Sequence, residues 1–248
     1  MSGTLLAIDA GNTRIKWGMH DGARWLKQGW VDTARAAELE AALRDLPPPQ
    51  TTLVSNVAGE RLNQQLASIL PPTPAARWIK SERAQCGVRN SYEDPAQLGC
   101  DRWAALIGAR RLYDGPAVVV NAGTALTVDA LAGDGVFVGG IIMPGAQLMR
   151  MALAGHTAAL KLQPGKFSFF PNATGDAIMS GAIDGLCGAI ERMARFLEET
   201  GHTMPLCVLS GGGAALLEPH LILEVKVVDN LVLEGLLTIA QTEPGARA

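Results

Sequence analysis

A short polar turn near the start of the chain carries side chains that could handle phosphate. Asp9, Gly11, Asn12 and Thr13 follow directly on the apolar run Leu5–Ile8. Glycine permits a close approach of the backbone, and such a turn can present backbone N–H groups beside polar side chains. Asp9 has the wrong charge to bind phosphate itself, so we expect a cation between them. Carboxylate and phosphate oxygens are common ligands of Mg²⁺.

The same pattern returns nearly half a chain length later. Asn121-Ala122-Gly123-Thr124 follows Val118–Val120 and aligns with Asp9-Ala10-Gly11-Asn12. A third glycine turn, Gly211-Gly212-Gly213, follows the apolar run Leu206–Leu209. The repetition favours two similar halves that bind a nucleotide. Two alternatives stay open: any hydrophobic hairpin of an α/β protein could give these letters, and the triple glycine could be a helix end and loop instead of a contact to adenine or ribose.

A second motif, Gly99-Cys100-Asp101-Arg102, could activate a hydroxyl group. It lies near the start of a helix predicted from the capping pattern Asp94-Pro95-Ala96-Gln97 and the apolar spacing that follows. We expect the helix dipole to keep the pKa of Asp101 low, so that the carboxylate is ionised and can accept a hydroxyl proton. Arg102 would anchor the substrate. The alternative is an ordinary first-turn aspartate with a surface arginine beside it.

Composition excludes several classes of protein. The chain has 248 residues, of which 48% are hydrophobic and 18% charged, which is typical of a globular protein. A net charge of −3 gives no basic field for nucleic acid. No apolar run reaches the roughly 18 residues of a membrane span, and no leader is expected. The four cysteines are scattered, which argues against a zinc site and favours a reducing cytoplasm.

Periodicity predicts the elements that position these motifs. Alternating or continuous apolar runs predict strands over 5–8, 14–20, 24–31, 51–57, 136–143 and 206–209. Apolar stripes predict helices over 34–46, 59–70, 146–154 and 174–199, the last with Thr174 as N-cap. The segments 221–228 and 231–240 are expected to complete the second half.

These motifs together resemble the type III pantothenate kinase family, also labelled Bvg accessory factor-like, across almost the whole chain. The first phosphate motif of the family resembles Asp9–Thr13 with Lys16, and its GxDR motif resembles Gly99–Arg102. Its second phosphate motif resembles Gly123-Thr124-Ala125 with Thr127 and Asp129. Two later blocks resemble the segments 139–145 and 172–181. Five motifs in the same order make the resemblance specific.

The resemblance implies ATP-dependent phosphorylation of pantothenate in the cytoplasm, the first step toward coenzyme A, with Asp101 as the general base. It assigns the ATP phosphates to Asp9, Ala10, Gly11, Asn12, Thr13, Arg14, Ile15, Lys16 and Thr124. It assigns pantothenate to Tyr92, Gly99, Cys100, Asp101, Arg102 and Thr174. ATP and pantothenate are thus the expected partners, without nucleic acid or membrane.

The implied fold class is α/β, with two ribonuclease-H-like halves of the actin-like ATPase and sugar-kinase superfamily and a nucleotide cleft between them. We divide the chain into residues 1–115, with the first phosphate motif and GxDR, and 116–248, with the second phosphate motif and dimerisation helices. The resemblance also implies a homodimer. The Met-rich helix 146–154 and the Gly-rich helix 174–199 fit that role.

The implied cofactors are Mg²⁺, with Asp9 orienting it, and a monovalent cation, K⁺ or NH₄⁺. One departure bears on the second ion: the family usually has aspartate where this chain has Asn121. The requirement for a monovalent cation is therefore open.

Two other functions remain compatible with the residues. A kinase of the same superfamily that acts on a sugar or acetate would share the two hairpins, although not the GxDR motif in this setting. A non-catalytic regulator on a kinase fold is the second alternative, but it would have no physical need of Asp9 and Asp101. The P-loop pattern G-x-x-x-x-G-K-[ST] is absent from the sequence.

Overall fold

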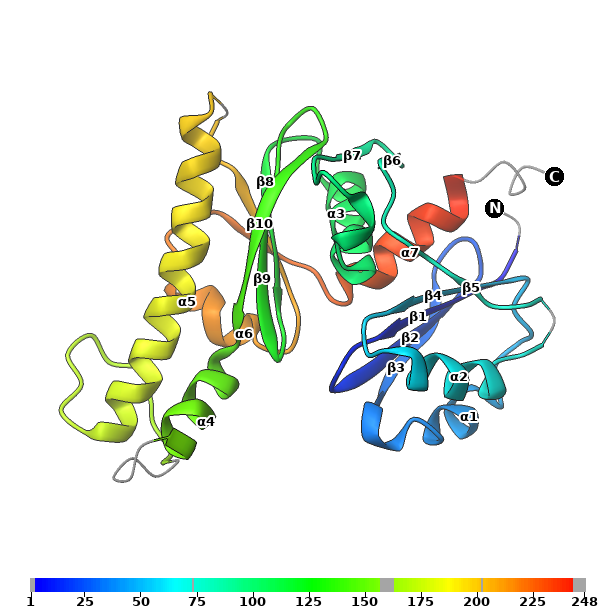
Figure 1. The fold of residues 1–248 in the computed structure, drawn as a ribbon, viewed down its shortest axis with the longest axis horizontal. Coiled ribbons are helices and arrows are strands. Elements are labelled where there is room, and N and C mark those ends of the chain that lie inside the picture. Colours follow the sequence, from blue (N-terminus) through cyan, green and yellow to red (C-terminus); the bar gives the residue numbers. More distant parts are fainter. Residues whose placement is uncertain (1–2, 73, 157–162, 202, 243–248) are drawn as a thin grey trace. The chain divides into compact units, whose positions relative to one another are not determined.

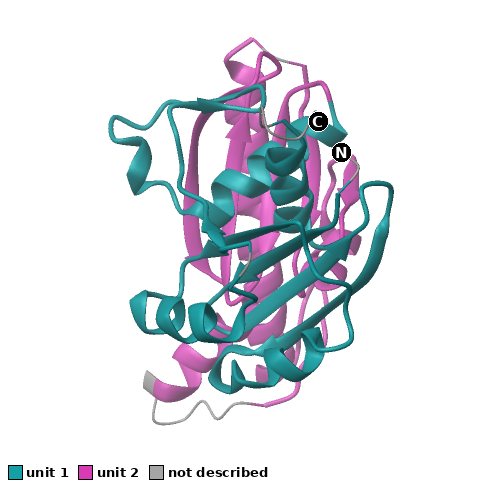
Figure 2. Ribbon diagram, turned by 90° about the vertical axis from the view of Figure 1, so that its right-hand side faces the viewer, with its two compact units in different colours: residues 1–113, 230–248 teal, residues 114–229 magenta. Residues whose placement is uncertain are grey.

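The structure is a computed structural model that describes residues 3–72, 74–156, 163–201 and 203–242. The chain forms two compact units, shown in teal and magenta in Figure 2. Unit 1 comprises residues 1–113 and 230–248, and unit 2 comprises residues 114–229. Residues 230–248, which the sequence-based division assigns to the second half, thus group with unit 1.

Unit 1 is built on a sheet with the strand order β3-β2-β1-β4-β5 (Figure 1). β1, β2 and β3 form an antiparallel meander, whereas β4 runs parallel to β1 and β5 parallel to β4. The bounds are β1 Leu5–Ala10, β2 Arg14–His20, β3 Trp25–Asp32, β4 Thr51–Asn56 and β5 Arg77–Trp78. The predicted strand–turn–strand over the first motif is therefore confirmed.

Side chains along β1 alternate between two covered faces. Leu6, Ile8 and Ala10 belong to one core with residues of α1 (Glu38–Leu43) and α2 (Glu60–Ile69). Because successive side chains of a strand point to opposite faces, Leu5, Ala7 and Asp9 point the other way. Helices α3 (Cys100–Leu112) and α7 (Leu231–Thr242) contact β4 and β1. Burial on both faces explains why the strand is apolar throughout except at Asp9.

Two glycines explain why α7 groups with unit 1. A side chain at Gly235 would overlap the carbonyl oxygen of Ala104, and one at Gly108 would lie 2.7 Å from the carbonyl oxygen of Leu231. The backbones of α3 and α7 therefore approach more closely than any side chain would allow. This long-range contact, 231–242 against 100–112, has no local signature in the sequence.

Unit 2 repeats the strand arrangement of unit 1. Its strands follow the order β12-β11-β8-β9-β10, with β8, β9 and β10 antiparallel and β11 and β12 parallel to β8. The bounds are β8 Ala117–Ala122, β9 Ala125–Leu131, β10 Val136–Pro144, β11 Leu206–Ser210 and β12 Val225–Val227. In each unit, two parallel strands extend the sheet on the open side of the first strand of a three-stranded antiparallel meander, so the prediction of two similar α/β halves is confirmed.

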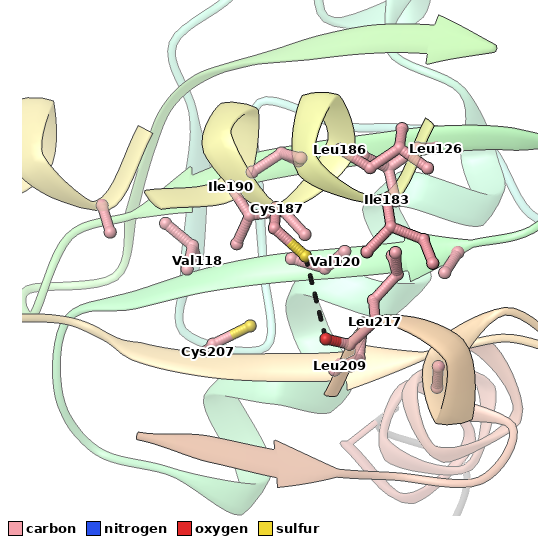
Figure 3. Packing of buried hydrophobic residues seen from close by; sticks show 14 residues of the cluster. Val118, Val120, Leu126, Ile183, Leu186, Cys187, Ile190, Cys207, Leu209 and Leu217 are labelled. Atoms are coloured by element: carbon pink, nitrogen blue, oxygen red, sulfur yellow. Dashed lines mark hydrogen bonds between the residues drawn. The ribbon is translucent and has the colours of Figure 1, made fainter. Parts of the chain in front are cut away.

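The core of unit 2 lies between the sheet and the long helix α5 (Thr174–Glu199). Figure 3 shows Ile183, Leu186 and Ile190 of this helix packed against Val118 and Val120 of β8. Cys187 lies in the same cluster, with its thiol 3.8 Å from the carbonyl oxygen of Leu217 in α6 (Ala214–Leu217). α4 (Ala146–His156) packs against α5.

The remaining short elements are 3₁₀ turns and one small hairpin. They are η1 (Thr33–Arg35), β6 (Ala84–Gln85), β7 (Val88–Asn90), η2 (Pro95–Gln97) and η3 (Glu218–His220). Among the helices that the structure describes, none is long and apolar enough to cross a membrane.

Several predicted elements differ in the structure. The helix predicted over 34–46 is reduced to η1 and the short α1, and within the segment 221–228 the regular structure is the strand β12. The capping pattern at Asp94 forms η2, which ends before Gly99, so α3 begins at Cys100. The N-cap of α5 is Ala173, not Thr174, and its side chain makes no capping bond.

Candidate active site

The loop between β1 and β2 is short and held by backbone bonds. The Gly11 N–H donates to the carbonyl oxygen of Arg14 at 3.0 Å. Asn12, Thr13 and Arg14 are exposed, whereas Ala10 and Ile15 are fully buried in the core. Of the residues assigned to ATP, Ala10 and Ile15 could therefore offer only backbone groups, and the exposed polar residues are the ones that could meet a phosphate.

Asp9 is a buried carboxylate at the end of β1. It is 8% exposed, pairs with Lys16 across the hairpin and lies opposite Ser55 of β4 in the sheet register. Burial, together with the negative charge of Asp101, raises the pKa of Asp9 from 3.8 to about 7, and the charge of Lys16 opposes this shift. The carboxyl groups of Asp9 and Asp101 thus interact electrostatically.

Asp101 lies in the first turn of α3, and Gly99 makes room for its carboxylate. The backbone N–H of Arg102 donates to Asp101 Oδ1 at 2.7 Å. A side chain at residue 99 would lie 2.6 Å from the same oxygen atom. The GxDR motif therefore has glycine at its first position because a side chain there would clash with the Asp101 carboxylate.

The expected low pKa of Asp101 is wrong. Burial raises the pKa of its carboxyl group, and the N–H and charge of Arg102 only partly offset that effect. The helix dipole favours the charged form, but the loss of water on burial outweighs it. A raised pKa is better suited to general-base catalysis, since proton transfer is most efficient when the pKa of the base is near the working pH.

Cys100 fastens the start of α3 to the end of β4. Its thiol donates to the carbonyl oxygen of Asn56 at 3.4 Å and lies 3.4 Å from the Ser55 hydroxyl. Burial raises the pKa of the thiol, so it remains protonated and able to donate. Because Ser55 stands beside Asp9 in the sheet, this contact ties the two aspartates to one scaffold.

Arg102 is buried, which contradicts the alternative of a surface aspartate and arginine pair. The residue is 6% exposed, and its Nη1 donates to the Tyr92 hydroxyl at 3.4 Å. The residue that follows Asp101 thus brings its guanidinium group into contact with a phenol. Such a pair can hold a carboxylate or a hydroxyl group of a substrate.

The other predicted site residues lie in unit 2. Thr124 is exposed in the loop between β8 and β9, and its carbonyl oxygen accepts from the Gly145 N–H at 2.8 Å. Asn121 is the last residue but one of β8 and lies opposite Ser210, and a side chain at Gly211 would lie 2.8 Å from its Oδ1. Thr174 is exposed at the start of α5. The glycine turn at 211 is thus packed against the end of β8.

Asp9 is the residue that fits a magnesium ion. A buried carboxylate ionises poorly without a counter-charge, and a divalent cation would supply one. Among the described residues, no three His, Cys, Asp or Glu side chains gather into a metal cluster. Mg²⁺ is commonly held by one or two carboxylates together with water and substrate phosphates, so Asp9 fits that form of binding.

Sequence reasoning missed residues that act on the backbone. Three residues outside the motifs contact predicted site residues. The Ser55 hydroxyl contacts the Cys100 thiol, the Thr33 hydroxyl contacts the Gly11 carbonyl oxygen, and the Arg83 guanidinium contacts the Tyr92 carbonyl oxygen. A threonine at the end of a strand or an arginine before a hairpin carries no local signal for such a contact. Only the tertiary structure reveals them.

Comparison with known proteins gives one consistent family. The family described as type III pantothenate kinase matches residues 5–195. A type III pantothenate kinase from Nitrosospira multiformis is 49% identical over 242 residues, covering 97% of this chain and 92% of the relative. One from Dechloromonas aromatica is 45% identical over 240 residues, covering 95% and 98%.

Solved structures agree on the fold. A protein described as a candidate 2-dehydro-3-deoxygalactonokinase from Sinorhizobium meliloti matches with a TM-score of 0.62 and 16% identity, covering 96% of this chain and 98% of that one. The activator of 2-hydroxyisocaproyl-CoA dehydratase from Clostridium difficile, with bound ADPNP, matches with a TM-score of 0.53 and 11% identity, covering 96% and 92%. At these identities the likeness concerns the fold alone.

Proposed function

The chain belongs to the type III pantothenate kinase family, and from this premise we propose that it transfers the γ-phosphoryl group of ATP to the hydroxyl group of pantothenate. The product is 4′-phosphopantothenate, and the reaction begins coenzyme A biosynthesis. The observation that carries the proposal is that Asp101 directly precedes the buried Arg102, whose guanidinium group contacts the Tyr92 hydroxyl, and that Asp9 lies in the same unit.

Each residue of this cluster has a part in the transfer. Asp101 accepts the proton as the pantothenate oxygen forms its bond to the γ-phosphorus, and the bond to ADP breaks. Arg102 and Tyr92 orient the acceptor, and the loop from Gly11 to Arg14, with Lys16, binds the phosphates. Phosphoryl transfer depends mainly on such positioning and charge neutralisation. We assign Thr124 to ATP and Thr174 to pantothenate by family resemblance.

Mg²⁺ supplies charge neutralisation on the phosphates when it is bound, and Asp9 would hold it, directly or through water. Lys16, the partner of Asp9 across the hairpin, adds a positive charge to the same region. We place the reaction in the cytoplasm, which is supported by the use of ATP and by four free cysteines.

An acceptor panel tests the function. Purified protein is incubated with ATP and Mg²⁺ and with pantothenate, several sugars or acetate in turn, and ADP release is measured. We expect turnover with pantothenate alone. Turnover with a sugar or acetate would favour another kinase of the superfamily, and no turnover with any acceptor would favour a non-catalytic regulator.

The monovalent cation forms a separate prediction. By sheet register, Asp129 lies on the same face of the sheet as Asn121, because both belong to the set that alternates with the buried Val120 and Val128. Asparagine keeps a carbonyl oxygen for K⁺ but lacks the charge. We expect Asn121→Asp to lower the half-activating K⁺ concentration by about fivefold or more, since a nearby unit charge is worth roughly 1–4 kcal/mol.

The test is a titration with KCl and with NH₄Cl at constant ionic strength, which is maintained by a bulky cation. Equal half-activating concentrations in both proteins would mean that residue 121 does not set cation affinity. In that case the monovalent site should be sought elsewhere.

We also propose a homodimer, supported by exposed apolar side chains in unit 2. Phe169 and Phe170 are 85% and 93% exposed, and α4 exposes Leu148 and Met151. Sedimentation velocity at micromolar concentration should show a dimer, and Phe170→Ser should shift it toward monomer because burial of the ring is lost.

Leu26→Ser is the control, because Leu26 is an exposed apolar residue of unit 1. It should leave the sedimentation coefficient unchanged. A wild-type protein that is monomeric and fully active would contradict the dimer.

A further inference from the structure

Arg83, which lies outside the motifs, forms several hydrogen bonds to the loop that carries Tyr92. Arg83 Nη1 donates to the carbonyl oxygens of Asn90 at 3.1 Å and Tyr92 at 2.8 Å. Its Nη2 donates to the carbonyl oxygen of Glu93 at 2.9 Å. A planar guanidinium with fixed donor directions can hold several carbonyl groups at once, which the single ammonium group of lysine does less well.

Asn90 completes the loop from inside. It is 3% exposed, its Oδ1 accepts from the Tyr92 N–H at 3.0 Å, and its Nδ2 donates to the carbonyl oxygen of Pro95 at 3.3 Å. Arg83 therefore binds carbonyl oxygens of the turn, and the buried Asn90 side chain binds the Tyr92 N–H and the Pro95 carbonyl oxygen. The backbone on both sides of Tyr92 is fixed by these two residues.

We propose that Arg83 is a positioning residue for the acceptor substrate, and this inference rests on the proposed function. The Tyr92 hydroxyl meets Arg102, which adjoins Asp101, so the turn that Arg83 holds determines where the phenol stands in the site. Arg83 touches no reacting atom. Its loss should loosen acceptor binding and leave ATP binding intact.

A second, independent observation concerns the phosphate loop. The Thr33 hydroxyl donates to the carbonyl oxygen of Gly11 at 2.7 Å, and the Thr33 N–H donates to the carbonyl oxygen of Thr13 at 2.9 Å. Thr33 directly follows β3, the last strand of the meander. Its hydrogen bonds therefore fix the loop between the first two strands, β1 and β2. Arg14 of the same loop stacks on Trp30, 4.1 Å from the ring centroid.

Unit 2 repeats this brace with a different residue. Gly145 directly follows β10, the third strand of that meander, and its N–H donates to the carbonyl oxygen of Thr124 at 2.8 Å. A side chain at Gly145 would overlap the carbonyl oxygen of Gly123. In both units, the residue after the third strand of the meander donates its backbone N–H to the loop between the first two strands. The additional hydrogen bond from a side-chain hydroxyl, that of Thr33, belongs to unit 1. We infer that Thr33 is a positioning residue for the ATP phosphates.

Because the two residues serve different substrates, each variant is a control for the other. Arg83→Lys should raise KM for pantothenate about tenfold or more, and Thr33→Val should raise KM for ATP about threefold to tenfold, as the loss of such hydrogen bonds predicts. The other KM and the melting temperature should change little in each. Thr33→Ser should keep the wild-type KM for ATP, since serine keeps the hydroxyl group.

Calorimetric titration with pantothenate, and with ATP, provides affinities that do not depend on turnover. Arg83→Gln is the second variant if Arg83→Lys does not fold. Thr4→Val is a further control, because Thr4 also donates to a carbonyl oxygen, that of Pro48 at 3.0 Å.

The outcomes separate the inference from the function. If the wild type phosphorylates pantothenate and Arg83→Lys or Thr33→Val leaves both KM values unchanged, that positioning role is wrong while the function stands. Equal increases in both KM values would also overturn the assignment to one substrate. If the wild type does not phosphorylate pantothenate, the proposed function fails and the assignment of Arg83 fails with it.

Discussion

Replacement of Asp101 by asparagine is expected to lower kcat by about 10²–10⁴-fold, the usual contribution of a general base. The amide cannot accept the hydroxyl proton at neutral pH. Its Oδ1 can still accept from the Arg102 N–H, so the first turn of α3 should keep its shape. Steady-state kinetics at saturating pantothenate, with ATP affinity measured by calorimetry, would show the loss of turnover without a loss of ATP binding.

Asp21→Asn is the matched control. Asp21 also accepts backbone N–H groups, from Ala23 and Arg24 at 2.8 Å each, but it lies in the turn between β2 and β3. Its replacement should leave kcat unchanged. Near-full kcat in Asp101→Asn would remove Asp101 from the catalytic role.

Replacement of Asp9 by asparagine is expected to raise the Mg²⁺ concentration needed for half-maximal activity by about 10–100-fold, as for other residues that orient a metal ion. The side chain keeps its size, but a divalent cation loses its negative partner. Titration of Mg²⁺ against ATP binding, followed by calorimetry, provides the same measurement without turnover. Unchanged Mg²⁺ dependence would leave Asp9 with a purely structural role in the turn.

The same variant should gain stability at high pH in Mg²⁺-free buffer. In the folded protein the pKa of Asp9 is raised to about 7 from 3.8, so the folded state binds the proton more tightly than the unfolded state. Wild-type stability should therefore fall as pH rises from about 4 to about 7, and asparagine removes this contribution. Thermal melts across that range should show Asp9→Asn more stable above pH 7, with the difference vanishing near pH 4. A difference independent of pH would contradict the burial of an ionisable Asp9.

The sequence predicted the repeated hairpins because their signal is local. An apolar run, a polar glycine turn and a returning strand occupy about a dozen residues, as at Leu5–Trp17, and period-two alternation sets the faces. The second copy near Asn121 strengthened the prediction, and the sheet orders confirm two similar halves. The long helix α5 was predicted with the correct bounds, since 26 residues give a clear period.

Contacts between distant segments could not be predicted in this way. The place of α7 in unit 1 depends on the close contact between Gly235 and the backbone of Ala104. The sequence around residue 235 carries no signal for this contact. The raised pKa of Asp101 depends on burial by the tertiary structure. The start of α3 contacts β4 through the Cys100 thiol and the Asn56 carbonyl oxygen, a pair distant in the sequence. The motifs thus indicate which residues could form the site, and the fold determines their environment.

The most direct test of the central claim is ³¹P NMR of the reaction mixture, with wild type and Asp101→Asn side by side in ATP, Mg²⁺ and pantothenate. The wild type should produce the resonance of a new phosphomonoester on pantothenate at the same rate as ADP appears. Asp101→Asn should bind ATP but produce almost none of it over the same time. No phosphomonoester from the wild type, or equal amounts from both proteins, would contradict the account.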